Sequence, residues 1–174
     1  MRARGRAWVF GDDINTDYII SAARKQSVRD LSEAARYLME DVRPGFGSLV
    51  RPGDLIVAGQ NFGCGSSREA APVVIKLAGV AGVVAASFAR IFYRNAINVG
   101  LPLLEAAPEG IADGDEVEVD FAAGTVRNLT RGGVIHGRPL PAFMRRILMA
   151  GGLVEYFTRH GQYPDPMVEG EETP

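Results

Sequence analysis

A short run of small, polar and basic residues is the part of this chain whose residue types are best suited to chemistry. It reads Asn61-Phe62-Gly63-Cys64-Gly65-Ser66-Ser67-Arg68-Glu69. Gly63 and Gly65 allow a backbone to approach a ligand closely, and the forked guanidinium of Arg68 is suited to a carboxylate. Ser66 and Ser67 stand between Gly65 and Arg68. The pattern therefore predicts a turn that binds an anion.

The segments on either side of this run place the two serines at the start of a helix. Leu55–Ala58 is a short apolar run typical of a strand, and apolar residues recur at helical spacing after the serines. Unpaired N–H groups and the dipole at a helix N-terminus stabilise an anion, such as a carboxylate, a phosphate or a serine alkoxide. Ser66 and Glu69 also fit a capping box, in which two side chains only satisfy the helix end. Capping requires neither the glycines nor the arginine, so both interpretations stay open.

The cysteine and histidine content argues against a metal site in this chain. There is one cysteine, Cys64, and the two histidines, His136 and His160, are far apart in the sequence. A single thiol forms no internal disulfide, and this spacing is not that of metal ligands. We therefore expect no metal or iron–sulfur cluster held by this chain alone. With no histidine near it in the sequence, Cys64 is interpreted as a buried, unreactive thiol.

Length and charge exclude several function classes. The chain has 174 residues and a formal net charge of -2, and its basic residues are scattered, which argues against nucleic-acid binding. Arg2, Arg4 and Arg6 form too short a cluster and are interpreted as a solvated end. No apolar stretch approaches the roughly 20 residues of a membrane span, and no signal peptide is evident. We expect a cytoplasmic protein with one domain over residues 1–160 and a flexible acidic tail over residues 161–174.

Strand-like runs and helical spacings alternate along the chain, which predicts an α/β domain. Further strands are expected at Trp8–Gly11, Gly82–Ala86 and Leu101–Glu105, with a hairpin of Val117–Phe121 and Gly124–Asn128. Further helices are expected at Leu31–Met39, Phe88–Val99 and Pro141–Phe157, the last broken at Gly151–Gly152. The basic segment from Ile19 to Arg29 is either a mobile loop that faces a substrate or a plain surface connection.

The helix expected at Phe88–Val99 has two faces. Ile91, Phe92 and Ala96 are expected to face the core. Arg90 and Arg94 are four residues apart and share another face, interpreted as a solvated stripe.

Four blocks in this order resemble the small subunit of the aconitase superfamily, in particular that of 3-isopropylmalate dehydratase and homoaconitase. The resemblance runs from about Trp8 to Phe157. The blocks are Gly11–Asp17, Arg51–Asp54, Gly63–Glu69 and Phe88–Gly100. It implies the swivelling β/β/α fold, which closes over a [4Fe–4S] cluster held by three cysteines of a separate large subunit. The implied assembly is a heterodimer or heterotetramer, with no cofactor in this chain.

The resemblance also implies a reaction and the residues that carry it. The reaction removes and re-adds water on a hydroxy di- or tricarboxylic acid, which moves the hydroxyl by one carbon. Ser66 matches the family's base, Ser67 matches a residue that hydrogen-bonds the substrate, and Arg68 matches one that pairs with its carboxylate. Asp17 matches an acidic residue near the site, where a carboxylate orients an arginine. A helix N-terminus would stabilise the serine alkoxide that such a base requires.

The chain departs from its relatives at Arg24-Lys25-Gln26-Ser27, where family members often carry a Tyr-Leu-Arg-Thr-like segment that reads the variable end of the substrate. An apolar isopropyl group favours an apolar contact, whereas a distal carboxylate favours Arg24 or Lys25. Isopropylmalate is the expected substrate on family prevalence, with homocitrate or another malate-like acid as the alternative. A non-catalytic module that binds a carboxylate or phosphate is the alternative of a different class.

Overall fold

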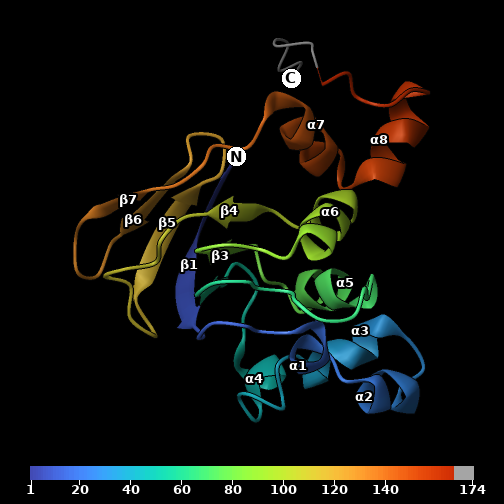
Figure 1. The fold of residues 1–174 in the computed structure, drawn as a ribbon, viewed down its shortest axis with the longest axis horizontal. Helices are drawn as coiled ribbons and strands as arrows, with labels where there is room; N and C mark the ends of the chain where they lie inside the picture. The colour runs from blue at the N-terminus through green and yellow to red at the C-terminus, as the bar shows by residue number, and fades with distance from the viewer. Residues whose placement is uncertain (167–174) are drawn as a thin grey trace.

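The strands form one mixed sheet of seven, in the order β4-β3-β2-β1-β5-β6-β7. A computed structural model describes residues 1–166 of the chain, and within that range the sequence folds as α/β (Figure 1). The strands are β1 (Arg2–Val9), β2 (Leu55–Ala58), β3 (Gly82–Ala85), β4 (Leu103–Glu105), β5 (Glu116–Asp120), β6 (Thr125–Asn128) and β7 (Val134–His136). The helices are α1 (Thr16–Ile19), α2 (Ala22–Ser27), α3 (Leu31–Ala34), the 3-10 turn η1 (Ala35–Tyr37), α4 (Phe46–Leu49), α5 (Ala70–Leu77), α6 (Arg90–Asn98), α7 (Ala142–Ala150) and α8 (Leu153–His160).

The parallel part of the sheet is buried on both faces. Strands β1 to β4 pair in parallel, and every residue of β2 and β3 is buried. Along β2 the side chains alternate between two hydrophobic cores, with Ile56 and Ala58 in one and Leu55 and Val57 in the other. Strands buried on both faces read as continuous apolar runs, which is why the sequence identifies them.

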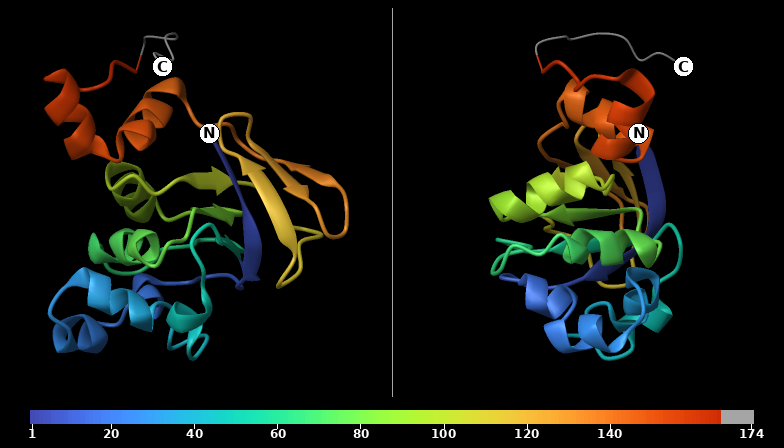
Figure 2. Two further views of the ribbon diagram at one scale, coloured as in Figure 1. Left: turned by 180° about the vertical axis from the view of Figure 1, so that it is seen from behind. Right: turned by 90° about the vertical axis from the view of Figure 1, so that its right-hand side faces the viewer.

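Strand β1 belongs to both parts of the sheet. Its last residues pair in parallel with β2, and residues 2–6 pair antiparallel with β5. Strands β5 to β7 lie on one side of the molecule, with α5, α6 and α8 on the other (Figures 1 and 2). The solvated end predicted for the N-terminal arginines is therefore wrong as a description of the backbone. The Arg2 and Arg4 side chains are exposed, but they form ion pairs of 2.7 and 2.8 Å with Asp120 and Glu116.

Several expected elements differ from the observed ones. The basic segment from Ile19 to Arg29 is not a loop, because it contains α2, and the helix expected at Leu31–Met39 is divided between α3 and η1. The break expected at Gly151–Gly152 is confirmed. Both glycines have positive φ, 99° and 146°, which ends α7 and turns the chain into α8. Ile91 was expected in the core, but it is 52% exposed. The tail expected to be flexible lies largely outside the described residues.

Candidate active site

Three loops converge at the carboxyl ends of the parallel strands, where open α/β sheets bind their ligands. These loops follow β1, β2 and β3, and together with α6 they line a hollow of about 300 Å³. Its lining comes from all three: Thr16, Gly63, Gly65, Ser66, Ser67, Arg68, Ala89, Arg90, Ile91, Phe92 and Asn95. The turn predicted to bind an anion thus forms one wall, and the start of α6 forms another.

Hydrogen bonds join the loop after β1 to the loop after β2 well beyond the ends of the strands. Backbone amides donate across this junction from Phe10 to Val57, Gly59 to Gly11, Asp13 to Gln60, Gly63 to Ile14 and Thr16 to Cys64, over distances of 2.7 to 3.1 Å. Side chains add to it, because Asp12 accepts the Gln60 amide at 2.7 Å and the Asn61 side chain donates to Asp13 at 2.8 Å. The two loops therefore continue the β1–β2 pairing and reach the hollow as one unit.

Two neighbouring residues of α1 hold the serine turn at two points. The hydroxyl of Thr16 donates to the backbone oxygen of Ser66 at 2.8 Å, and Thr16 is only 2% exposed. The carboxylate of Asp17 forms a 2.6 Å ion pair with Nη2 of Arg68. The Asn15 side chain caps α1 by accepting the Asp17 amide at 2.7 Å. The ion pair with Asp17 orients the Arg68 guanidinium.

Glycine is required at both predicted positions, but for different reasons. Gly63 has φ 79°, and a Cβ there would overlap the ring of Phe92. The backbone at Gly63 therefore lies close to a packed side chain of α6, and not to a ligand as the sequence pattern suggested. Gly65 has φ 88°, and a Cβ there would make only ordinary contacts with Asn15 and Thr16, at 3.4 to 3.9 Å, so this glycine serves the backbone turn itself.

The capping box predicted for Ser66 and Glu69 is not formed. Helix α5 begins at Ala70, with Glu69 as its N-cap residue and no side-chain cap. The serines therefore precede the helix instead of forming its first turn. The local pattern fails because pairing through Cys64 holds the loop next to α1, so the following residues must span the distance to α5. Among the described residues, neither the Ser66 hydroxyl nor the amides from Gly65 to Arg68 have a hydrogen-bond partner.

Comparison with known proteins connects this geometry to a family. The family model described as the Aconitase C-terminal domain matches residues 49–109, which include the serine turn and α6. The 3-isopropylmalate dehydratase small subunit 2 of Archaeoglobus fulgidus is 54% identical over 161 residues, which cover 92% of this chain and 98% of that protein. The chain belongs to the aconitase-superfamily family of dehydratase small subunits.

Two further relatives extend the similarity of this small subunit. The methanogen homoaconitase small subunit of Methanothermobacter thermautotrophicus is 53% identical over 156 residues, covering 90% of this chain and 91% of that one. The crystal structure of a 3-isopropylmalate dehydratase from Methanocaldococcus jannaschii superimposes with a TM-score of 0.88 at 45% identity. It covers 92% of this chain and 96% of its own. The predicted family and fold are confirmed.

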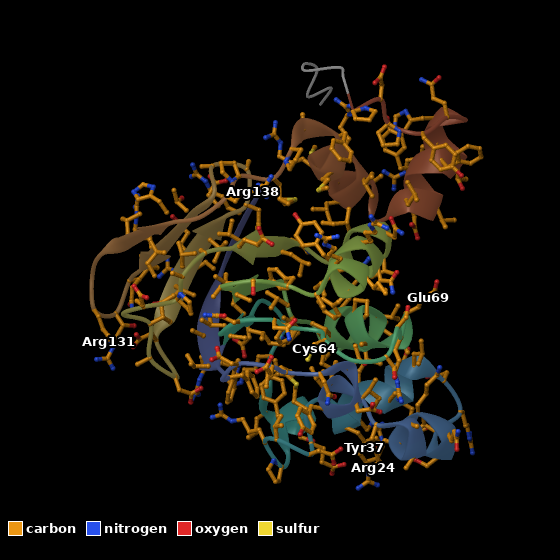
Figure 3. All side chains as sticks on the ribbon, in the orientation of Figure 1. Arg24, Tyr37, Cys64, Glu69, Arg131 and Arg138 are labelled. Carbon is orange, nitrogen blue, oxygen red and sulfur yellow. The ribbon has the colours of Figure 1, made fainter. Side chains whose placement is uncertain are left out.

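Residues 24–27 lie apart from the hollow in this small subunit. All four side chains are exposed on α2, and none lines the hollow. Arg24 Nε lies 2.8 Å from Glu40 Oε2, an ion-pair distance without hydrogen-bond geometry, and the guanidinium is 4.5 Å from the centre of the Tyr37 ring. Figure 3 shows Arg24 and Tyr37 away from Cys64 and Glu69. The structure therefore brings Asp17, Ser66, Ser67 and Arg68 together, but not the predicted specificity segment.

Cys64 is partly buried and does not line the hollow. Burial and the negative charge of Asp13 raise the pKa of the thiol, which disfavours the nucleophilic thiolate. Within residues 1–166, no group of three or more histidine, cysteine, aspartate or glutamate side chains is placed to hold a metal ion. No helix in this range is long and apolar enough to cross a membrane.

Sequence reasoning gave no role in the site to three polar residues that line the hollow, Thr16, Arg90 and Asn95. Thr16 was treated only as part of a matched block, although a buried threonine at the start of a short helix beside the site has a clear structural role. Arg90 was interpreted as part of a solvated stripe. Its position on the first turn of a helix that follows a parallel strand is the signal that indicates the site.

Proposed function

We propose that this chain is the small subunit of a hydro-lyase that isomerises a hydroxy di- or tricarboxylic acid by dehydration and rehydration, with 3-isopropylmalate as the substrate. One observation carries the proposal. The Ser66 hydroxyl, which has no partner among the described residues, lines the same hollow as Arg68, which Asp17 orients at 2.6 Å. The relatives named as 3-isopropylmalate dehydratase support this substrate, and the homoaconitase relative supports homocitrate as the alternative.

The roles of the residues follow from their chemistry. Arg68 pairs with a substrate carboxylate, which places the adjacent carbon near the serines. Ser66 takes the proton from that carbon, and Ser67 hydrogen-bonds the substrate. A serine is a weak base unless its alkoxide is stabilised. The unpaired amides from Gly65 to Arg68 and the positive start of α6 supply that stabilisation in the same hollow.

This chain does not fit a cluster-binding role. A [4Fe–4S] cluster requires about three or four thiolate ligands, and the chain has one cysteine. We assign the cluster to a separate large subunit, together with the group that accepts the departing hydroxyl. The exposed residues of α2, including Arg24 to Ser27, are available to read the substrate only once that subunit covers this surface.

The test is assembly with the cluster-bearing large subunit, followed by anaerobic assay against isopropylmalate, homocitrate, citrate and methylated malates. We expect no turnover by this chain alone and turnover of isopropylmalate by the complex. Ser66→Ala should lower kcat by about 100-fold or more, since general base catalysis contributes about 10²- to 10⁴-fold. Ser48→Ala, on the exposed surface of α4, is the matched control and should keep the wild-type rate.

Two results would count against this proposal. Turnover by the purified chain without a partner contradicts the division of the site between subunits. A full rate in the assembled Ser66→Ala enzyme contradicts the base assignment and favours a module that only binds a carboxylate or phosphate.

A further inference from the structure

Arg90 lines the same hollow as the serine turn, but it comes from a different element than Arg68. It is the first residue of α6, whereas Arg68 comes from the loop after β2. The hollow therefore receives an arginine from each of two elements. Two more residues of α6 line it as well. The apolar Ile91 directly follows Arg90, and Asn95 lies more than one turn further along the helix.

The two arginines differ in what holds them. Arg68 is 24% exposed and is paired with Asp17. Arg90 is exposed, and among residues 1–166 no carboxylate or other acceptor contacts its guanidinium. An arginine that lines a hollow without a protein partner has all of its donors available to a ligand.

The position of Arg90 at a helix start is unfavourable unless an anion is present. The N-terminus of a helix carries a partial positive charge, so a cation there is repelled and an anion is stabilised. The first turn of α6 contains no acidic residue, and the cap residue Ala89 offers no side-chain acceptor. The amides of Arg90 and Ile91 also have no acceptor among the described residues. The charge of Arg90, the unpaired amides at the start of α6 and the hollow beside them therefore all favour an anionic ligand.

We infer that Arg90 is a substrate-binding residue that pairs with the second carboxylate of the substrate, the one that Arg68 does not hold. This inference rests on the proposed function, in which every candidate substrate carries at least two carboxylates. One carboxylate pairs with Arg68 next to the reacting carbon. The other lies against the first turn of α6, where Ile91 offers an apolar contact for an alkyl group on the same face of the hollow.

The chain offers a matched control for this inference. Arg94 is on the same helix, is also exposed, and likewise has no partner among the described residues, but it does not line the hollow. Arg90→Gln, Arg90→Lys and Arg94→Gln should each be assembled with the large subunit under anaerobic conditions. Thermal unfolding of each isolated chain checks that folding is unchanged, as expected for exposed side chains.

We expect Arg90→Gln to raise KM for isopropylmalate by about 10- to 100-fold, the range for losing a hydrogen-bonded charged pair, with kcat changed less than about threefold. Arg90→Lys should show an intermediate KM because it keeps the charge but loses the bidentate geometry. Arg94→Gln should match the wild type. Binding to the complex of isopropylmalate, and of the analogue lacking one carboxyl group, is measured by calorimetry. The preference for the dicarboxylate should be lost in Arg90→Gln.

The outcomes separate this inference from the proposed function. If the wild-type complex turns over isopropylmalate and Arg90→Gln has the same KM as Arg94→Gln, the inference is overturned and the function stands. The same holds if Arg90→Gln only weakens subunit assembly. If the complex has no turnover but binds isopropylmalate in a manner that depends on Arg90, the function fails and the inference stands. If the complex neither turns over nor binds dicarboxylates, both are overturned.

Discussion

Replacing Thr16 by valine tests whether the loop after β1 positions the serine turn that we propose to be catalytic. The substitution keeps the shape of the side chain and removes only the hydroxyl that donates to the Ser66 backbone oxygen at 2.8 Å. Thr16 is 2% exposed, so water cannot easily replace the lost contact from its side. The Ser66 oxygen lies on an exposed residue and can bind water instead.

The expected effects on stability and rate differ in size. Loss of one hydrogen bond of this kind costs about 0.5–1.5 kcal/mol, which corresponds to a fall in Tm of about 1–6 °C for a chain of this length. A displacement of the reacting group by about 1 Å can cost about 10²-fold in rate. We therefore expect kcat to fall by about 10- to 100-fold. KM should change by less than about threefold, because Asp17 holds Arg68 independently.

The assay is steady-state dehydration by the assembled enzyme, together with thermal unfolding of the isolated chain. Two controls isolate the hydroxyl. Thr158→Val removes a comparable bond, from Thr158 Oγ1 to the Val154 oxygen at 2.8 Å, on an exposed part of α8, and it should leave kcat unchanged. Thr16→Ser keeps the hydroxyl but loses a buried methyl group, so it should lower Tm while retaining most of kcat.

Two results would refute this reasoning. If Thr16→Val lowers Tm but turns over as fast as Thr158→Val, the bond to Ser66 is only structural. If Thr16→Ser loses as much rate as Thr16→Val, packing of the methyl group, and not the hydrogen bond, determines the position of the turn.

Two further predictions concern stability. Gly63→Ala should lower the free energy of unfolding by about 2 kcal/mol or more, because its Cβ would overlap Phe92 in addition to straining a positive φ. Gly110→Ala, also at positive φ but with open space around it, should cost only about 1 kcal/mol in the same urea titration, and equal losses would contradict the packing argument. Hydrogen bonds from Arg43, together with the Val9 amide and the charge of Arg6, lower the pKa of the Asp113 carboxyl from 3.8 to about 2. The Arg43–Asp113 pair therefore stabilises the fold above pH 3.8, and its contribution is lost as the pH falls through 2. The stability difference between wild type and Arg43→Gln should therefore shrink between these pH values, and a difference independent of pH would show that Arg43 acts through its packing alone.

The sequence predicts the parallel strands well because a strand buried on both faces is a continuous run of apolar residues. Leu55–Ala58 is apolar at every position. The break at Gly151–Gly152 is also predictable, because it depends on two adjacent glycines with positive φ. Residues 2–6 of β1 escaped prediction because their arginines alternate with alanine and glycine, and only pairing with β5 makes them a strand. The capping pattern of Ser66 and Glu69 was overridden for the same physical reason, since a distant segment fixes this loop.

The site was predicted in part, because only some of its residues are neighbours in sequence. A family resemblance predicted that Asp17 lies near the site and orients an arginine, and the structure identifies that arginine as Arg68. The approach of Arg90 depends on the convergence of loops after two different strands. The position of Arg90 on the first turn of a helix that follows a parallel strand is a signal for the site, and the lack of a side-chain cap and of an acidic residue in that turn adds to it.

The exposure of the serine turn gives a physical reason for the second subunit. Ser66 and Ser67 are both exposed to solvent in this chain. An alkoxide formed there would be surrounded by water and readily protonated by it. Hydrogen bonds and charges act more strongly on a reacting group when water is excluded. The β1–β2 junction and Asp17 fix one half of the site in advance, but they cannot enclose it. The proposed chemistry therefore requires a large subunit that covers the hollow, in addition to the cluster that we assign to that subunit.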